Sequence, residues 1–513
     1  MKFQKVCAVF LAASIAASVF SGCGKAASAP AQSVVATSVA TQKAPDTVKK
    51  APKYVFLFIG DGMSYPQFQA ASDYLGAIEQ PNAEILKGGK ALNFMNFPVV
   101  GSATTFDSTS FAPDSASTAT SLSTGFKTHS GVINMDETKT KSYETITEKL
   151  KKQLGYKIGV ISTVNLNHAT PAAFYAHQPT RNNYYEISEE LAKSDFDYFA
   201  GGGLKDTTGK DKDKTDSYEI IANAGYKIVK TQAEAEKLTA ADGKTVVIGE
   251  TLADSDSLSY SNDTASGEWT LKDYVKKGIE MLTNDKGFFM MVEGGKIDWA
   301  CHANDAGSTV SDTIAMADAV EEALAFYKEH PDETLILVTG DHETGGLTIG
   351  YAGTDYDTYL ANLANQKISY AKYDSDFVSG YKENQTPFAQ VLKDIKENFG
   401  LMTKEDPAAT QDSKLVLTDY EYGLLQAAYE KSMAPKTDDA ATQEEYVLYG
   451  TYEPLTVTIT HLLNNKSGIN FSSYAHTGLP VAVFAQGVGQ EAFDSFYDNT
   501  AIYTKMATLL NVQ

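Results

Sequence analysis

The chain has 513 residues, 43% of them hydrophobic and 21% charged, which is ordinary for a soluble globular protein. This length is enough for one large α/β unit or for two to three domains. The formal net charge of −22 argues against nucleic acid as a partner. Because an acidic surface does not attract anions, a site for an anionic ligand must carry local positive charge, which bound metal ions would supply.

The N-terminus has the pattern of an export signal. Two lysines within residues 1–5 precede an apolar run of mostly small side chains over residues 6–20, which is too short for a typical membrane span. Two small residues stand directly before Cys23, which resembles the lipobox of bacterial lipoproteins. We predict a signal peptide over residues 1–22 and an exported protein, at the cell surface or in the periplasm, anchored by a lipid on Cys23. Plain secretion is the alternative.

A low-complexity segment follows the signal. Residues 23–50 are rich in Ala, Ser, Thr, Val, Gln and Pro and contain no aromatic side chain, so we predict a flexible tether. The folded body is expected over residues 51–513. The chain has only three cysteines, at positions 7, 23 and 301, so export comes without a disulfide framework.

The folded body is expected to begin with a buried strand over residues 54–59, a continuous apolar run. The glycine-flanked Asp61 that follows is costly to bury unless something pairs with it. Farther along, Pro113 precedes a Ser-, Thr- and Ala-rich stretch, which is how a helix begins, with Asp114 as its cap. Ser115 then faces the positive end of the helix, where an anion is favoured. Taken alone, this is an ordinary capped helix start.

Helices and strands then alternate. Helices are expected over residues 145–154, 271–282 and 311–328, and strands over residues 156–163, 244–249, 287–292 and 334–339. The last two strands run into Glu293 and Asp341. Asp298 and His302 are spaced i, i+4, so on a helix they share one face, which suits two ligands of one metal ion. The alternation predicts an α/β fold with a doubly wound, mostly parallel central sheet flanked by helices.

The segment 353–447 differs in composition. It is polar, acidic and rich in tyrosine, with helical patches over residues 388–399 and 420–433. We interpret it as a crown-like cap inserted into the fold. A strand over residues 479–485 and a helix around residues 501–510 are expected near the C-terminus.

Acidic residues are expected to converge on one edge of the sheet. In a doubly wound sheet the carboxyl ends of the strands line the ligand crevice, and Asp61, Glu293 and Asp341 all follow such ends. Three carboxylates on one edge would repel one another strongly unless cations lay between them. Together with nearby histidines, the pattern predicts a metal centre.

Six short blocks together resemble the alkaline phosphatase family. They are FIGDGM (58–63), PDSASTAT (113–120), HATPA (168–172), VEGGKID (292–298), TGDHE (339–343) and AHTG (475–478). One block is weak evidence, but six in the family's order are very specific. The resemblance covers most of the body from Tyr54 onward and is weakest over residues 204–270 and 353–447. It implies that residues 51–513 form a catalytic domain that hydrolyses phosphate monoesters outside the cytoplasm.

The resemblance also assigns roles to residues. Ser115 resembles the nucleophile that takes the phosphoryl group, and Arg181 resembles the residue that grips two phosphate oxygens. The resemblance assigns a first zinc ion to Asp298, His302 and His476, a second to Asp61, Asp341, His342 and the Ser115 hydroxyl, and a magnesium ion to Asp61, Thr170 and Glu293. These ligand types suit those metals.

Two positions depart from the family pattern. Some members have aspartate where His168 stands, and a lysine that contacts phosphate through water where Trp299 stands. Histidine favours softer ions than magnesium, so our hypothesis is a third site that binds magnesium weakly and accepts cobalt, manganese or zinc.

Alternatives to a phosphate monoesterase stay open at this point. A phosphodiesterase of the same superfamily is one, because the cap that would set substrate size is the least readable region. A non-catalytic solute-binding lipoprotein is the other, since the lipobox and tether fit it equally well. The family is often dimeric, so a homodimer is also open, although no interface is readable in the sequence.

Overall fold

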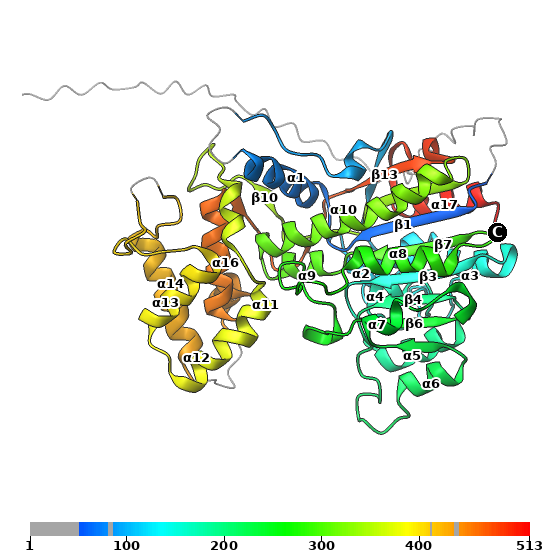
Figure 1. Cartoon of the computed structure of the whole chain (residues 1–513), viewed down its shortest axis with the longest axis horizontal. Coiled ribbons are helices and arrows are strands. Elements are labelled where there is room, and N and C mark those ends of the chain that lie inside the picture. Colours follow the sequence, from blue (N-terminus) through cyan, green and yellow to red (C-terminus); the bar gives the residue numbers. More distant parts are fainter. Residues whose placement is uncertain (1–50, 81–85, 411–412, 436–440) are drawn as a thin grey trace, which may run out of the picture. The chain divides into compact units, whose positions relative to one another are not determined.

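The computed structural model describes residues 51–513 except 81–85, 411–412 and 436–440 (Figure 1). The predicted signal peptide, the tether and the proposed anchor at Cys23 lie outside the described residues. The helices and strands below therefore concern the folded body alone.

A ten-stranded sheet runs through the described part of the chain in the order β14-β2-β13-β8-β1-β7-β3-β4-β6-β5. Its strands are β1 (Tyr54–Gly60), β2 (Val99–Thr104), β3 (Lys157–Ser162), β4 (Tyr198–Gly201), β5 (Lys227–Val229), β6 (Thr245–Ile248), β7 (Phe288–Glu293), β8 (Thr334–Gly340), β13 (Val481–Gly487) and β14 (Ser495–Asp498). Every neighbouring pair is parallel except the two made by β13, which runs antiparallel to β2 and β8. The predicted mostly parallel sheet is confirmed.

Helices cover both faces of this sheet. Alternate side chains of β1 serve two cores, with Phe56 and Phe58 in one and Val55 and Leu57 in the other. The first core also receives α1 (Tyr65–Glu79), α7 (Gln232–Ala235), α8 (Leu271–Leu282) and α10 (Ala306–Glu329). The second receives α2 (Ser115–Thr124), α3 (Ile146–Lys149), α4 (Ala169–Ala172), α5 (Tyr184–Lys193), α6 (Ser217–Asn223) and α17 (Thr500–Leu510). The doubly wound arrangement is thus confirmed (Figure 1).

Short elements bring distant segments together above the strand ends. Helix α9 (Lys296–His302) follows β7 directly. The two-residue strands β9 (Glu343–Thr344) and β12 (His476–Thr477) pair with each other, and β10 (Thr348–Ile349) pairs with β11 (Ile469–Asn470). The β9–β12 pairing places His476 opposite Thr344, two residues after His342, although the two histidines are far apart in sequence.

The tyrosine-rich segment is helical. It contains α11 (Tyr370–Tyr373), α12 (Ser379–Asn384), α13 (Phe388–Phe399), α14 (Asp419–Met433) and α15 (Gln443–Tyr449). The helices predicted over residues 388–399 and 420–433 are confirmed by α13 and α14. Helix α14 packs against α16 (Pro454–Ser467), which the sequence analysis did not anticipate. Among the described residues, no helix combines the length and apolar character needed to cross a bilayer.

Candidate active site at the strand ends

Three neighbouring strands end in buried carboxylates. Strands β8, β1 and β7 lie side by side, with Gly60 opposite Gly340 and Ile59 opposite Glu293. Asp61, Asp341 and Glu293 are each at most 1% exposed. The structure therefore confirms that the three carboxylates converge on one edge of the sheet.

This burial disturbs the ionisation of all three acids. Desolvation, together with the neighbouring charges of Asp341 and Asp298, raises the pKa of Asp61 well above its usual value. Desolvation and nearby carboxylates likewise raise the pKa values of Asp341 and Glu293 to about 7. Burying three neighbouring carboxylates in their charged form is costly unless positive charge lies between them, so the cluster is suited to bound cations.

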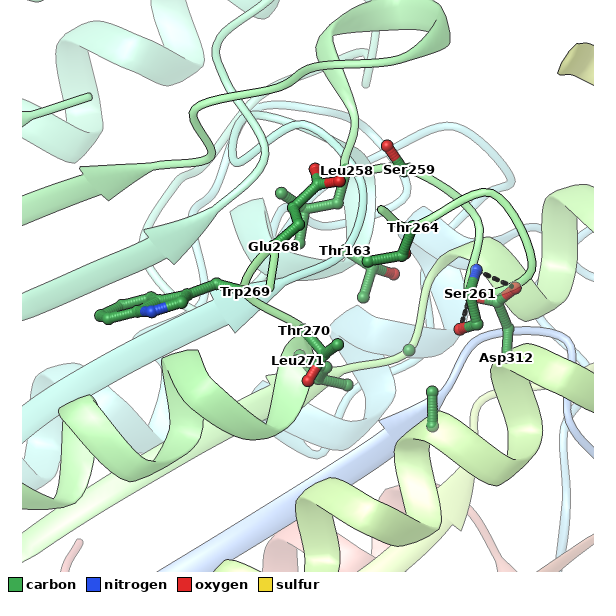
Figure 2. Close-up of a pocket in the computed structure, with 12 residues that line it drawn as sticks. Thr163, Leu258, Ser259, Ser261, Thr264, Glu268, Trp269, Thr270, Leu271 and Asp312 are labelled. Atoms are coloured by element: carbon green, nitrogen blue, oxygen red, sulfur yellow. Dashed lines mark hydrogen bonds between the residues drawn. The ribbon is translucent and has the colours of Figure 1, made fainter. Parts of the chain in front are cut away.

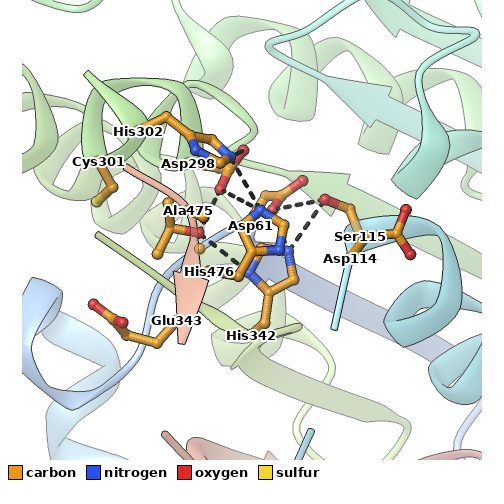
Figure 3. Close-up of polar contacts among 12 residues, drawn as sticks. Asp61, Asp114, Ser115, Asp298, Cys301, His302, His342, Glu343, Ala475 and His476 are labelled. Atoms are coloured by element: carbon orange, nitrogen blue, oxygen red, sulfur yellow. Dashed lines mark hydrogen bonds and ion pairs between the residues drawn. The ribbon is translucent and has the colours of Figure 1, made fainter. Parts of the chain in front are cut away.

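Ser115 lies at the mouth of this cluster, on the first turn of α2. Its helix begins as the sequence predicts, with the Asp114 carboxylate accepting a 3.1 Å hydrogen bond from the Ser117 amide. The Ser115 Oγ lies 3.4 Å from Asp61 Oδ1 and 3.1 Å from His342 Nε2 (Figure 3). The Ser115 hydroxyl therefore lies at a helix N-terminus and next to an aspartate and a histidine, two residue types that bind metal ions.

Two histidines face each other beside Asp298. The Nε2 atoms of His302 and His476 are 3.0 Å apart, and they lie 3.4 and 3.5 Å from Asp298 oxygens. Each ring points its Nδ1 at a backbone carbonyl, of Tyr474 at 2.6 Å and of Pro113 at 2.5 Å.

Those two carbonyls decide which nitrogens are free. A carbonyl only accepts hydrogen bonds, so each Nδ1 carries a hydrogen, and the Nε2 atoms of the two rings, which face each other, are the atoms available to a metal ion. Burial, followed by the nearby His342, lowers the pKa of His476 to about 3, which keeps its ring neutral. Two ring nitrogens and a carboxylate at such distances fit a shared cation, and the ligand atoms of Asp298, His302 and His476 all lie within 4.8 Å of one another.

A second cluster surrounds His342. Its Nε2 lies 3.3 Å from both Asp61 Oδ1 and Asp341 Oδ2. Burial lowers the pKa of His342 to about 4, so its imidazole is neutral and able to coordinate. Asp61, Asp298 and His342 place their ligand atoms within 4.8 Å of one another. This cluster adjoins the first, because Asp298 belongs to both.

A third cluster combines Asp61, Glu293 and His168. The Thr170 hydroxyl donates a 3.1 Å hydrogen bond to Asp61 Oδ2, which brings all the predicted third-site residues together. Glu293 Oε1 and His168 Nδ1 are buried without a hydrogen-bond partner among the described residues. Unpaired buried polar atoms are rare, and a bound ion would satisfy Glu293.

Arg181 and Trp299 complete the predicted site. The Arg181 guanidinium donates to Asp114 at 2.9 Å and to His168 Nε2 at 3.0 Å. Burial opposes its charge, but Asp114 outweighs that effect and raises the pKa of Arg181. The Trp299 ring lies 5.9 Å from the His168 ring and brings no charge of its own.

Sequence reasoning missed the residues that orient these groups. The Thr344 hydroxyl donates to Asp298 at 2.5 Å, and the Thr118 hydroxyl donates to Asp341 at 3.1 Å. Ser162 donates to Glu293 from the end of β3. Thr118 lies inside the motif that contains Ser115, so its role could have been predicted from the sequence. Ser162 becomes significant only once β3 is known to pair with β7.

A small cavity lies between α10 and the loop before α8 (Figure 2). It holds about 30 Å³, which is room for about one or two waters and not for a phosphate ester. Asp312 at its wall accepts hydrogen bonds of 3.2 and 3.1 Å from the amide and hydroxyl of Ser261. The strand-end clusters are therefore the better candidate site.

An α/β sheet whose strand ends carry metal-ligand clusters beside a serine at a helix N-terminus is typical of one class of protein, the metal-dependent hydrolases. The comparison with protein families narrows it. The family model described as alkaline phosphatase matches residues 52–512, and the chain belongs to the alkaline phosphatase family. It is accordingly an enzyme of a metal-dependent family that acts on phosphate esters.

Individual relatives agree with this assignment. Alkaline phosphatase 4 of Bacillus subtilis (strain 168) is 29% identical over 473 residues, which cover 90% of this chain and 89% of the relative. The alkaline phosphatase of Escherichia coli (strain K12) is 30% identical, over 57% of this chain and 70% of its own. Among solved structures, the cold-active alkaline phosphatase of the psychrophile Shewanella sp. has a TM-score of 0.72 at 27% identity, covering 89% of this chain and 99% of that one.

Proposed function

We propose that the chain hydrolyses phosphate monoesters through a phosphoserine on Ser115, at a centre of two zinc ions and one magnesium ion. The observation that carries this proposal is the position of the Ser115 hydroxyl, 3.4 Å from Asp61 and 3.1 Å from His342 at the start of α2. A serine hydroxyl is a weak nucleophile near neutral pH and needs a partner that favours the alkoxide.

The proposed metal sites follow the three clusters. Asp298, His302 and His476 would hold the first zinc ion; Asp61, Asp341, His342 and Ser115 Oγ the second; Asp61, Thr170 and Glu293 the third ion, with His168 beside it. Nitrogen and carboxylate ligands suit zinc, and oxygen ligands suit magnesium. When bound, these ions would supply Lewis-acid stabilisation of negative charge on the reacting oxygens.

Ser115 and Arg181 have separate roles in the proposed reaction. Ser115 Oγ gives up its proton to solvent and attacks phosphorus, the ester P–O bond breaks, and the departing alkoxide takes a proton from solvent and leaves as the alcohol. Water then attacks the phosphoserine, which restores the Ser115 hydroxyl and releases inorganic phosphate. Arg181, 2.9 Å from the helix cap Asp114, is positioned to bind two phosphate oxygens in the bidentate manner that lysine cannot match.

The decisive test replaces the nucleophile. Ser115→Ala should reduce p-nitrophenyl phosphate hydrolysis by about 1,000-fold or more, measured with zinc and magnesium present. Ser121→Ala on the same helix is the matched control, because Ser121 bonds only to backbone carbonyls. Undiminished turnover in Ser115→Ala would reject the proposal.

The third site is a separate proposal. His168 stands beside it, so we propose that magnesium binds weakly there and that cobalt, manganese or zinc are accepted. In support, a histidine-to-aspartate variant of the alkaline phosphatase of the Antarctic bacterium TAB5 was solved with magnesium in its M3 site, and that protein is 26% identical with a TM-score of 0.59. His168→Asp should tighten magnesium binding by about tenfold, measured by calorimetry, and equal affinities would contradict this.

The remaining proposals concern location and architecture. We propose export under a signal peptide over residues 1–22, a lipid anchor on Cys23, a tether over residues 23–50, and a cap over residues 353–447 that limits access to the site. A homodimer is compatible with these proposals. Mass spectrometry of the mature N-terminus tests the anchor, since an unmodified Cys23 would contradict it.

A further inference from the structure

An aromatic vestibule lies next to the proposed metal centre. We define it by five rings that line one cavity of about 390 Å³: Trp299, Tyr370, Tyr446, Tyr452 and Tyr474. Trp299 comes from α9, the helix that carries Asp298 and His302. Three of the tyrosines come from α11, from α15 and from the loop that leads to α16. The cavity therefore joins the tyrosine-rich segment to the catalytic edge of the sheet.

The rings of the vestibule hold one another in place. The Tyr452 ring lies 5.7 Å from that of Tyr370 and 6.1 Å from that of Tyr474, and Tyr446 lies 6.5 Å from Tyr474. The Tyr474 hydroxyl donates a 2.6 Å hydrogen bond to the Leu448 carbonyl. A wall of this kind offers preformed faces and edges on which a planar group can stack without first ordering flexible side chains.

The vestibule opens on the side where a leaving group would depart. Phosphoryl transfer places the attacking and departing oxygens in line, so a nucleophile at Ser115 sends the leaving group away from α2. The cluster beyond Ser115 contains His302, whose Nε2 lies 3.0 Å from that of His476. His302 also lines the vestibule. A leaving group that departs past His302 thus enters the aromatic cavity.

The charge of the walls narrows the class of leaving group. Among the residues that the structure describes, the cavity lining contains no lysine or arginine. Its one carboxylate, Asp254, is already paired with the Lys296 ammonium at 2.8 Å. Hydroxyl groups of tyrosine, Ser255 and Thr451 provide the rest of the polarity. These walls suit an uncharged planar group and offer no cationic side chain to pair with a second phosphate.

We infer that the vestibule is a leaving-group subsite that favours phosphate monoesters of aromatic alcohols and nucleosides over those of small non-aromatic sugars. This inference rests on the proposed phosphatase function. It predicts that adenosine 5′-monophosphate has a higher kcat/KM than ribose 5-phosphate. Both esters release a primary alcohol on the same ribose carbon, so the difference isolates the contribution of the base.

Ring-removing variants test the subsite. Tyr446 is 49% exposed and lies outside the proposed catalytic groups, so Tyr446→Ala should fold. The ratio of kcat/KM for adenosine 5′-monophosphate to that for ribose 5-phosphate should fall about 2- to 10-fold in Tyr446→Ala, the range of one aromatic contact. Tyr452→Phe, which keeps its ring, should retain the ratio, whereas Tyr452→Ala should lose it. Tyr420→Ala, 74% exposed on α14 and outside the cavity, is the matched control.

A binding measurement tests the subsite without any need for phosphate release. Adenosine, which lacks the phosphate, should show saturation-transfer NMR contacts with the wild type that weaken in Tyr446→Ala and persist in Tyr420→Ala. Equal kcat/KM for the two substrates in the wild type, or equal ratios in Tyr446→Ala and Tyr420→Ala, would overturn the subsite while leaving the phosphatase intact. If neither adenosine 5′-monophosphate nor ribose 5-phosphate releases phosphate, the proposed function is overturned, and the subsite with it.

Discussion

The strand-end rim, by which we mean the three clusters around Asp61, Asp298 and Glu293, and the tyrosine-rich segment 353–447 are stabilised in different ways. The strand ends gather carboxylates and histidines from positions 61 to 476, and the carboxylates Asp61, Asp341 and Glu293 are buried close together, an arrangement that bound cations would stabilise. The segment 353–447 builds local helices around apolar residues such as Leu425, which is fully buried. The site residues of the first region lie in short sequence motifs whose residue types suit metal ions. A region that depends on packing is encoded by composition, which tolerates many sequences.

After removal of the nucleophile, the largest expected effect is the loss of one proposed metal ligand at the strand ends. His302→Ala should lose about one zinc ion per chain and at least about 100-fold in kcat/KM, because Lewis-acid stabilisation is worth several kcal/mol. Metal analysis and p-nitrophenyl phosphate assays measure both quantities. His129→Ala is the control outside the clusters. A variant with unchanged zinc content would remove His302 from the ligand set.

A cavity in the tyrosine-rich segment should have the complementary effect. Leu425 belongs to α14 and has no exposed surface, so Leu425→Ala should destabilise the segment by ~2–5 kcal/mol. Hydrogen exchange in α14 and α16 should accelerate accordingly, while the zinc content stays that of the wild type. If Leu425→Ala also releases metal, the two regions are energetically coupled, which would contradict the view that they are stabilised independently.

The last prediction concerns a partly buried charge that carboxylates of the protein itself balance. His177 lies 3.4 Å from Glu148 and 3.3 Å from Glu190. Burial alone would lower the pKa of His177, but hydrogen bonds and charge from the two glutamates outweigh it and raise that pKa to about 10. The unfolded-state pKa is about 6.5.

The sign of the pH dependence follows from these values. The stabilising contribution of His177 is fully present below about pH 6.5 and is lost as the pH rises toward 10. His177→Gln should therefore show a smaller loss of stability between pH 7 and pH 10 than the wild type, measured by urea unfolding at both values. His129→Gln should behave like the wild type. Identical pH profiles for His177→Gln and the wild type would show that the pair contributes nothing.

The sequence was most informative where chemistry restricts the residue type. Asp61, Glu293 and Asp341 were predictable because each follows a continuous apolar strand, and parallel strands share one edge. The i, i+4 spacing of Asp298 and His302 placed them on one face of α9. The backbone carbonyls that orient His302 and His476 were not predictable, because every residue has a carbonyl and only the fold shows which one is near.

Prediction failed where packing or pairing overrides local preference. Helix α16 contains five consecutive β-branched residues at positions 456–460, a run that favours a strand, yet burial against α14 makes it helical. Strand β2 contains Gly101 and little apolar character, and it is recognisable only beside β13 and β14. Helix α10 begins five residues before the expected start because Asp305 caps it through the Ser308 amide.

The most direct test is the divalent-metal content of the purified protein, measured together with its phosphatase activity. Convergence of buried carboxylates and facing histidine nitrogens predicts two zinc ions and one further divalent ion per chain, with activity lost on chelation and restored by zinc. Protein that contains fewer than about 0.1 divalent ions per chain and still hydrolyses phosphate monoesters at the full rate would contradict the claim that cations hold the rim together.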